Sequence, residues 1–333
     1  MKNILFTGGT GYIGGPILSR LIERNDPNLN ITALVRSAAK VEKINTLNLR
    51  LNVVPGSHSD ATLVERLASE ADVVFSLADC DDLPAAEAVL RGLKKRFEAT
   101  GRKPVLIHMS GTGCLGDNAK GLFASYTIYN DINIAQIESL PATQPHRNVD
   151  LAIVQADTHG YAETYIVAPP GVYGTPHGIL ADAGVQNVTN AAFDSLISIS
   201  FKRGAAGVIG EGKNITGHVD VTEVGDLVVL LYDTITANPA LAGHGRNGYY
   251  FADNGDIEFV EITKVIEATV GPRRPLTQEE LDEALPGRYN VQRFFGDNSR
   301  SRPERSRALG WRPIKTTEDF LAALRDQIEN WKA

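Results

Sequence analysis

A glycine-rich turn near the start of the chain constrains the fold more than any other feature of the sequence. The apolar run 3–7 leads into Thr7-Gly8-Gly9-Thr10-Gly11-Tyr12-Ile13-Gly14, and an amphipathic helical pattern follows at once. Gly8 permits a tight turn, Gly11 lets the backbone approach a pyrophosphate, and Gly14 lets the helix pack on the strand. The free N–H groups that open such a helix bind phosphate. We therefore expect a dinucleotide site, or alternatively a purely structural turn, at Gly8, Thr10, Gly11, Tyr12, Ile13 and Gly14.

Short apolar runs alternate with amphipathic helical patterns through the first half of the chain. This strict β-α rhythm is typical of an α/β fold with a doubly wound parallel (Rossmann) sheet, whose strands are covered on both faces. The runs with strand character are 3–7, 31–36, 51–55, 72–77, 105–110 and 164–168, and the helical patterns are 11–24, 38–49, 61–69, 84–100 and 147–157.

The rhythm breaks after about residue 170, where glycine and proline become frequent between helical patterns. We expect residues 1–169 to form the dinucleotide-binding domain and residues 170–333 to form a smaller, mixed but mostly helical substrate lobe. An apolar run near 248–252 is expected to return to the main sheet as a further strand. The helices expected in the lobe are 190–202, 223–237, 259–270, 277–284 and 317–331.

The charge balance narrows the class of protein. The 333 residues include 33 Lys and Arg against 40 Asp and Glu, a net charge of −7, and no basic cluster marks a surface for nucleic acid or anionic membrane. No apolar run is long enough to cross a membrane, and a strand begins where a signal peptide would lie. We therefore expect a cytoplasmic protein that acts on a small molecule, with no nucleic-acid or membrane partner.

The cysteine and histidine content predicts no metal site. Cys80 and Cys114 are too few for a disulfide framework, and we expect them to be small, buried or half-buried side chains in a reducing compartment. The sequence has no His-x-x-x-His motif and no Cys/His cluster at metal-ligand spacing.

Four segments match one protein family in order along nearly the whole chain. They are Gly-x-x-Gly-x-x-Gly from Gly8, Pro169-x-x-Val172-Tyr173-Gly174, Gly210-x-Gly212-x-Asn214 with His218-Val219-Asp220-Val221, and Leu309-Gly310-Trp311-x-Pro313. Together they resemble the extended short-chain dehydrogenase/reductases, specifically the atypical NmrA-like branch and the fungal nucleoside-diphosphate-sugar-epimerase-like proteins. The resemblance implies a nicotinamide dinucleotide in contact with the Pro169–Val172 turn. It also implies a homodimer formed through helices 84–100 and 147–157.

The end of the second expected strand bears on the choice of cofactor. It reads Leu34-Val35-Arg36-Ser37, without the acidic residue that holds the ribose 2′-hydroxyl of NAD. Arg36 can instead pair with the 2′-phosphate of NADP, although a solvated strand-end arginine is the alternative. His58, after the third strand, is a candidate for stacking on the adenine, and the resemblance places Leu77 and Ala78 at the nicotinamide-side ribose. We expect NADP, with NAD as the less favoured cofactor.

The catalytic signature of the family is only half present. The resemblance implies a Ser or Thr after the fifth strand, and Ser110 and Thr112 occupy that place, unless their hydroxyls only satisfy the strand-end backbone. It also implies a Tyr-x-x-x-Lys pair on the next helix, where the lysine lowers the pKa of the tyrosine. No such pair follows the fifth strand.

Three residues are candidates for the missing proton donor. Tyr126 and Tyr129 lie in a loop long enough to fold over the nicotinamide. His146 lies close to the position that the resemblance gives the missing pair, and it precedes Asp150 by one helical turn, so the two side chains can share a face. The alternative is a helix-start histidine, with Asp150 in an ion pair with Arg147.

These features favour an NADP-dependent oxidoreductase that reduces a carbonyl, an imine or an activated alkene of a small organic molecule. The missing Tyr-x-x-x-Lys pair supports a first alternative, a non-catalytic NAD(P)-binding sensor. Non-redox chemistry in a reused cofactor fold is a further alternative. A last alternative is a sugar-nucleotide epimerase or dehydratase, which needs a basic clamp for a diphosphate. The candidates for that clamp are Lys202, Arg203, Arg246 and Arg300.

Overall fold

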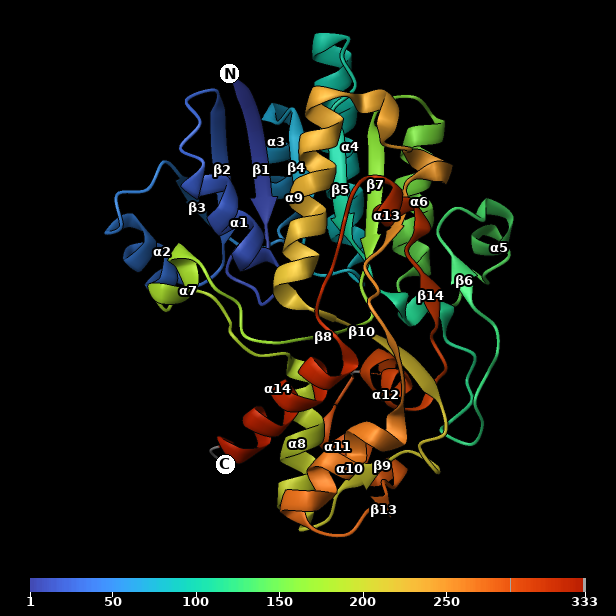
Figure 1. The fold of residues 1–333 in the computed structure, drawn as a ribbon. Coiled ribbons are helices and arrows are strands. Elements are labelled where there is room, and N and C mark those ends of the chain that lie inside the picture. Colours follow the sequence, from blue (N-terminus) through green and yellow to red (C-terminus); the bar gives the residue numbers. More distant parts are fainter. Residues whose placement is uncertain (288, 332–333) are drawn as a thin grey trace.

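A computed structural model describes residues 1–287 and 289–331. Within these residues, seven strands form one parallel sheet in the order β11-β7-β5-β4-β1-β2-β3 (Figure 1). The chain thus moves outward from β1 in one direction and then in the other, which confirms the expected doubly wound Rossmann fold. The strands are β1 Lys2–Thr7, β2 Leu29–Val35, β3 Asn52–Pro55, β4 Val73–Ser76, β5 Val105–Met109, β7 Glu163–Ala168 and β11 Tyr249–Phe251.

Helices cover both faces of this sheet (Figure 1). Side chains alternate between the faces along each strand, so Ile4 and Phe6 of β1 contribute to the core on one side and Leu5 to the core on the other. The first side is covered by α1 Gly14–Glu23, α2 Ala38–Asn45 and α9 Val221–Ala237, and the second by α3 Ala61–Glu70, α4 Leu83–Thr100 and α6 Arg147–Thr158.

The position of α9 differs from the expected division of the chain. The pattern 223–237 was assigned to the substrate lobe, but Tyr232 of α9 contacts Phe75 of β4 edge-on, with ring centroids 5.4 Å apart. Leu227 and Leu231 lie in the same core as the strands. The chain therefore returns to the sheet for α9 and again for β11, which pairs in parallel with β7. Sequence order alone does not reveal such a return, because α9 directly follows β10, a strand of the lobe.

The remaining chain forms a lobe beyond the carboxyl ends of the sheet strands (Figure 1). Its core contains Phe193, Phe259, Phe295 and Phe320, all at most 2% exposed. The strands of the lobe form three small sheets, β8 Gly171–Tyr173 with β10 Ile215–Asp220 and β12 Asp256–Glu258, β9 Gly207–Val208 with β13 Arg274–Pro275, and β6 Tyr129–Asn130 with β14 Ser301–Arg302. The larger helices are α8 Ala191–Arg203, α10 Phe259–Val270, α11 Gln278–Ala284, α12 Tyr289–Gly296 and α14 Thr317–Glu329.

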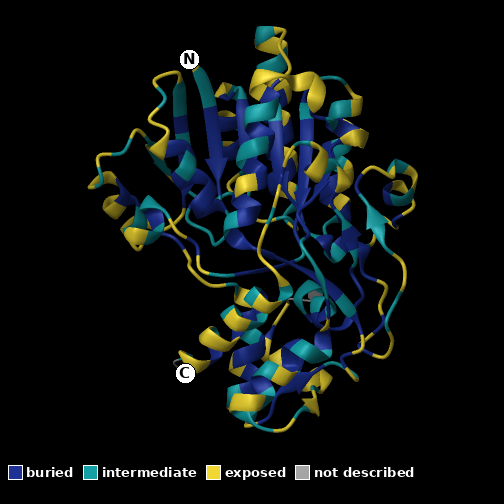
Figure 2. Ribbon diagram, viewed as in Figure 1, coloured by how far each residue is buried: buried dark blue, intermediate teal, exposed yellow. Residues whose placement is uncertain are grey.

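Short helical turns join these elements. They are η1 Thr112–Leu115, α5 Ile134–Glu138, α7 Ile179–Asp182, η2 Pro239–Leu241, η3 Gly245–Asn247 and α13 Glu304–Ala308. Figure 2 shows the strands of the large sheet buried between the helices, whose outer faces are exposed. In residues 1–287 and 289–331, no helix combines the length and the apolar character that a membrane span requires.

The segment around Trp311 anchors the C-terminal part of the chain to α9. The Trp311 indole N–H donates to the backbone carbonyl of Glu223 at 2.9 Å. One carboxylate oxygen of Glu223 accepts from the backbone N–H groups of Ile314 and Lys315, at 2.6 and 2.8 Å. Through these hydrogen bonds, the Leu-Gly-Trp-x-Pro segment connects α9, which packs on the sheet, to the start of α14.

Candidate active site

The glycine-rich turn has the conformation that a phosphate loop requires. Gly8 has a φ of +79°, and its carbonyl accepts from Gly11 N–H at 2.8 Å. A side chain at Gly8 would lie 2.4 Å from the carbonyl oxygen of Leu77. The loop therefore rests directly on the end of β4, which places Leu77 and Ala78 beside it.

The start of α1 is open to a ligand. A Cβ at Gly14 would lie 2.3 Å from the Gly8 carbonyl oxygen, so that position must be glycine for the helix to approach the loop. Within 4 Å, a Cβ at Gly11 would meet only atoms of Gly8, the nearest being the same carbonyl oxygen at 3.0 Å. Among the described residues, the space that this Cβ would point into is therefore open. Ile13 at the N-cap provides no capping side chain, and the first turn has no acidic residue. The free amide groups of this turn therefore fit a pyrophosphate.

A second segment, residues 184–190, lies against the phosphate loop and was missed by sequence reasoning. Asn187 N–H donates to the Thr10 carbonyl at 3.0 Å. Lys40 Nζ contacts both the Thr10 carbonyl, at 3.5 Å, and Asn187 Oδ1, at 3.2 Å. The Gln186 side chain fills the space beside Gly15 and is 6% exposed, and neither of its polar atoms has a hydrogen-bond partner within residues 1–287 and 289–331. A buried amide without a partner next to a phosphate loop marks a place where a bound ligand would supply the partner.

Tyr12 links the loop to the lobe. Its hydroxyl donates to the Gly174 carbonyl at 2.6 Å, within the turn that the family resemblance singled out. Burial, together with the nearby Asp220 and Asp194, raises the pKa of Tyr12 above its ordinary value. Tyr12 is therefore a neutral positioning group between the two parts of the molecule.

The residues expected near the adenosine half of the cofactor lie at the carboxyl ends of β2 and β3. Arg36 is exposed and makes no ion pair or hydrogen bond with any residue in the described part of the chain. Ser37 caps α2 by accepting from Lys40 N–H. His58 Nε2 lies 3.5 Å from Asp82 Oδ2, so its ring is held by the loop before α4. Arg36 thus remains available to a 2′-phosphate.

The turn after β7 is mainly structural. Pro169 is buried, and its carbonyl accepts from Thr112 N–H at 3.0 Å. Val172 is 3% exposed in the first sheet core, and its carbonyl accepts from Asn190 Nδ2 at 2.8 Å. Thr112 also accepts from Ser299 through its carbonyl, at 2.7 Å, and it therefore joins the sheet edge to the lobe.

The two loop tyrosines have separate environments. Tyr126 is 90% exposed. Tyr129 lies in β6, paired in parallel with Ser301 of β14, and its half-buried ring packs against the second sheet core. Burial raises the pKa of Tyr129, which does not favour proton release. Neither tyrosine is brought to Ser110 by a contact in the described structure.

His146 is the candidate that the structure brings to the sheet edge. It stands immediately before α6 with a φ of +65°, a backbone conformation that is rare outside glycine and asparagine and often occurs at functional positions. Its side chain is 13% exposed and does not cap the helix. A Cβ at Gly111 or Gly113 would lie 3.1 or 2.9 Å from Nε2. The ring therefore covers the backbone directly after Ser110.

The other ring nitrogen binds the loop after β4. His146 Nδ1 lies 2.7 Å from Asp81 Oδ1 and 3.3 Å from Cys80 Sγ. The second Asp81 oxygen accepts from Asn290 Nδ2 of α12 at 2.9 Å. Burial alone would lower the pKa of His146, but the hydrogen bonds to Asp81 and Cys80 outweigh it and raise the pKa well above the ordinary value. The shift favours the protonated ring, and Nε2 lies on the opposite side of the ring from the Asp81 contact.

The predicted partnership of His146 with Asp150 is wrong, and the alternative, an ion pair of Asp150 with Arg147, does not form among the described residues either. His146 pairs with Asp81 because its left-handed backbone turns the ring away from the α6 axis. Arg147 donates to the Tyr249 hydroxyl and to the Ile137 carbonyl.

A set of buried polar groups lies behind Ser110. The Ser110 hydroxyl, both oxygens of Asp150 and both ring nitrogens of His108 lack partners at hydrogen-bond distance and angle among the described residues. Burial raises the pKa of Asp150 to about 6, opposed by the nearby Ser110 hydroxyl. Burial lowers the pKa of His108 to about 3. The Ser110 hydroxyl therefore lies buried beside the Asp150 carboxyl, at the strand end where the sequence predicts a catalytic hydroxyl.

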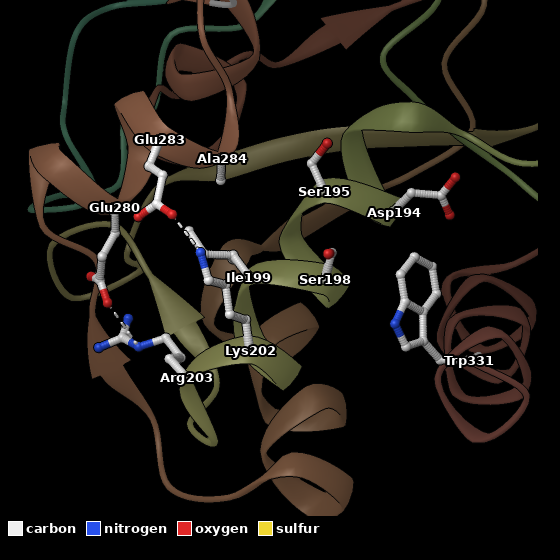
Figure 3. A pocket seen from close by; sticks show the side chains of 10 residues that line it. All are labelled: Asp194, Ser195, Ser198, Ile199, Lys202, Arg203, Glu280, Glu283, Ala284 and Trp331. Atoms are coloured by element: carbon white, nitrogen blue, oxygen red, sulfur yellow. Dashed lines mark hydrogen bonds and ion pairs between the residues drawn. The ribbon is translucent and has the colours of Figure 1, made fainter. Parts of the chain in front are cut away.

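The four basic residues considered for a diphosphate clamp are all paired with carboxylates. Figure 3 shows Lys202 with Glu283 and Arg203 with Glu280, around a cavity of about 580 Å³ on α8. The other two pairs are Arg246 with Glu138 and Arg300 with Asp256. Each of these residues would have to leave its carboxylate in order to bind a diphosphate.

Comparison with known proteins agrees with the cofactor site. Residues 8–139 match a family model described as NAD(P)H-binding. An Acremonium protein named oxidase ucsJ is 26% identical over 94% of this chain and 93% of that protein. A Mycobacterium tuberculosis 3 beta-hydroxysteroid dehydrogenase/Delta 5-->4-isomerase is 23% identical over 96% of this chain and 89% of that protein.

Solved structures agree with the architecture. The Thermotoga maritima UDP-glucose 4-epimerase has a TM-score of 0.64 at 16% identity, over 98% of this chain and 97% of that chain. The Bacillus anthracis dTDP-glucose 4,6-dehydratase, solved with NAD, has a TM-score of 0.63 at 16% identity, over 99% and 96% of the two chains. At such identity these likenesses describe the fold. Residues 8–139 are thus an NAD(P)H-binding domain, and the chain as a whole has the fold of the extended short-chain dehydrogenase/reductases.

Proposed function

We propose that the protein is an NADP-dependent reductase of a small carbonyl, imine or activated-alkene compound, in which His146 replaces the usual tyrosine as proton donor. The observation that carries this proposal is the pair formed by His146 and Asp81 at the end of β5. The ring has one nitrogen on a carboxylate and the other beside the backbone that follows Ser110.

The chain provides a binding group for each part of the cofactor. The amide groups at the start of α1 and the Gln186 amide bind the pyrophosphate, and Arg36 binds the 2′-phosphate. Leu77 and Ala78 lie beside the loop, toward the nicotinamide half. When bound, NADPH supplies the hydride for the reduction.

The protein groups then act on the substrate heteroatom. Ser110 donates a hydrogen bond that orients the carbonyl oxygen. As that oxygen gains the electron pair of the broken C=O π bond, His146 Nε2–H transfers its proton to it, and His146 becomes neutral. Asp81 keeps Nδ1 protonated throughout, which holds the tautomer and stabilises the imidazolium before transfer.

The test follows NADPH oxidation with a panel of aldehydes, ketones, cyclic imines and enones. For any reduced compound, His146→Gln should lower kcat by about 10²- to 10⁴-fold, and Ser110→Ala by about tenfold or more, with little change in NADPH affinity. The matched control is His244→Gln, because His244 also lies 2.7 Å from a carboxylate, that of Asp157, but away from the sheet edge. Tight NADPH binding without reduction of any compound would overturn the proposal and favour the sensor.

That the protein forms a homodimer stays a prediction. The helices α4 and α6, through which the resemblance implies a homodimer, contact each other on one side of the sheet. Leu151 of α6 is 38% exposed there. Light scattering of the wild type and of Leu151→Glu tests this assembly, since a charge should separate an apolar dimer.

A further inference from the structure

Three metal-binding side chains meet at the sheet edge, although the sequence predicted no such cluster. Cys80 Sγ, an Asp81 carboxylate oxygen and a His146 ring nitrogen all lie within 4.8 Å of one another. Cys80 and Asp81 are adjacent in the loop after β4, whereas His146 is more than sixty residues away in the sequence. This distance explains why motif spacing did not reveal the cluster.

Both partners of His146 converge on the same ring nitrogen. Asp81 Oδ1 is 2.7 Å from Nδ1, and Cys80 Sγ is 3.3 Å from it. One N–H cannot point well at two acceptors, but one metal ion can bind all three atoms. Ligand atoms on a tetrahedral zinc ion are roughly 3.3 to 3.7 Å apart, given metal–ligand distances of about 2.0 to 2.3 Å. To accept the ion, the Asp81 oxygen must move about half an ångström away from Nδ1, and it must lie roughly 3.3 to 3.7 Å from Cys80 Sγ, to which it is now within 4.8 Å.

The chemistry of the three groups selects among metals. A thiolate, an imidazole and a carboxylate suit zinc, whereas magnesium and calcium prefer oxygen ligands alone. Cys80 is half-buried, and the loop that carries it is partly exposed, so an ion has access. Asn290 already hydrogen-bonds the second Asp81 oxygen at 2.9 Å, which would orient the carboxylate as an outer-shell partner does.

We propose that Cys80, Asp81 and His146 form a Zn²⁺ site whose occupation switches off the reductase. The ion replaces the Nδ1 proton and the thiol proton, and a water molecule completes its coordination. With Zn²⁺ on Nδ1, loss of the Nε2 proton would leave an imidazolate instead of a neutral imidazole, so His146 becomes a much weaker acid and proton donation stops. The inhibition rests on the proposed function, but the binding of zinc does not.

Zinc binding is measured first, on chelator-treated protein under reducing conditions, by competition of Zn²⁺ alone with a metal indicator. We expect one equivalent to bind, and Cys80→Ser to weaken binding by more than about 100-fold, since even outer-shell changes cost 10- to 100-fold. The matched controls are Cys114→Ser, which alters a cysteine 1% exposed in the core, and His244→Gln. Equal affinity in wild type and Cys80→Ser, or no binding by the wild type, would overturn the site.

Cobalt spectroscopy keeps the test independent of variant folding. Co²⁺ added to the unaltered chain should give a thiolate charge-transfer band and the visible bands of a tetrahedral ion. A Co²⁺ spectrum without the thiolate band would contradict the site. Inhibition is measured second, with each variant compared with its own zinc-free rate. Zinc should inhibit the wild type reversibly and leave the Cys80→Ser rate unaffected at the same concentration. Zinc binding in a chain that reduces no compound would retain the metal site and reject the reductase.

Discussion

His146 Nδ1 lies 2.7 Å from Asp81 Oδ1, and this contact joins the start of α6 to the loop after β4. It lies at the carboxyl ends of the sheet strands, the edge at which doubly wound folds bind their ligands. The carboxylate fixes which ring nitrogen carries the shared proton and stabilises the charged ring. A histidine held in this way has the geometry that the proposed reduction requires of its proton donor.

The glycine loop predicts different effects at two of its positions. Gly11→Val should abolish detectable NADPH binding with little loss of thermal stability, because the added side chain projects into the space a pyrophosphate needs. Gly14→Ala should instead lower Tm, because its Cβ would lie 2.3 Å from a backbone oxygen. Cofactor titration and thermal unfolding of both variants check this. Unchanged NADPH affinity in a folded Gly11→Val protein would place the cofactor elsewhere.

Arg36 should select NADPH over NADH. A charge-assisted pair with the 2′-phosphate contributes about 1.5 to 3 kcal/mol, or roughly 10- to 150-fold in affinity. Arg36→Ala should weaken NADPH binding by this factor and leave NADH binding nearly unchanged, and the difference should shrink with added salt because Arg36 is exposed. Dissociation constants of both cofactors settle the point, with Arg50→Ala as the control for a lost surface charge. A wild type that binds NADH as tightly as NADPH would refute the assignment.

Gln186 should affect the free and the bound protein in opposite directions. Its buried amide has no partner in the described structure, so Gln186→Met should leave the free protein as stable as the wild type or more so. The same change should weaken NADPH binding by about tenfold or more, since a hydrogen bond to a charged group is lost. Thermal unfolding without and with NADPH measures both effects. Equal NADPH stabilisation of the two proteins would show that Gln186 does not reach the cofactor.

Asp150 should make stability depend on pH. Burial raises the pKa of this carboxyl to about 6 in the folded protein, above its ordinary value. The folded state therefore keeps a proton that the unfolded state releases, so stability falls as the pH rises from about 4 to 6 and stays lower above. Asp150→Asn has no such ionisation and avoids this loss. The difference in unfolding free energy, Asp150→Asn minus wild type, should therefore be about 2 to 3 kcal/mol larger at pH 8 than at pH 4. Urea unfolding at both pH values checks this, and parallel pH curves would contradict it.

Local patterns were sufficient to predict most of the sheet and the phosphate loop. The strand at 3–7 and the glycines at 8, 11 and 14 determine their own conformation through turn chemistry and apolar patterning, and β1 and α1 have the predicted form. The helix begins only at Gly14, because the three preceding residues form the turn itself. The layer of α9 could not be predicted, since it depends on packing against Phe75 from a distant part of the chain.

In the candidate site, too, local sequence indicates some residues, whereas their contacts depend on the fold. Ser110 is predicted because it directly follows a strand, and His146 because of its distance from the sixth strand. The partner of His146 was assigned wrongly, since helical spacing favoured Asp150 whereas the left-handed backbone directs the ring to Asp81. Gln186 and Cys80 carry no motif, and only the folded chain brings them to the loop and to the histidine.

The most direct test of the account compares the pH dependence of kcat for NADPH-dependent reduction in the wild type and in Asp81→Asn. Because His146 must be protonated to act as the acid, kcat should fall as the pH rises through its pKa, which lies well above the ordinary histidine value. In Asp81→Asn the carboxylate no longer raises the pKa of His146, whereas burial still lowers it. The alkaline limb of the Asp81→Asn profile should therefore move to lower pH. Asp157→Asn, which alters the other His–Asp pair, should leave the limb in place. An alkaline limb at the same pH in wild type and Asp81→Asn would show that His146 is not the proton donor.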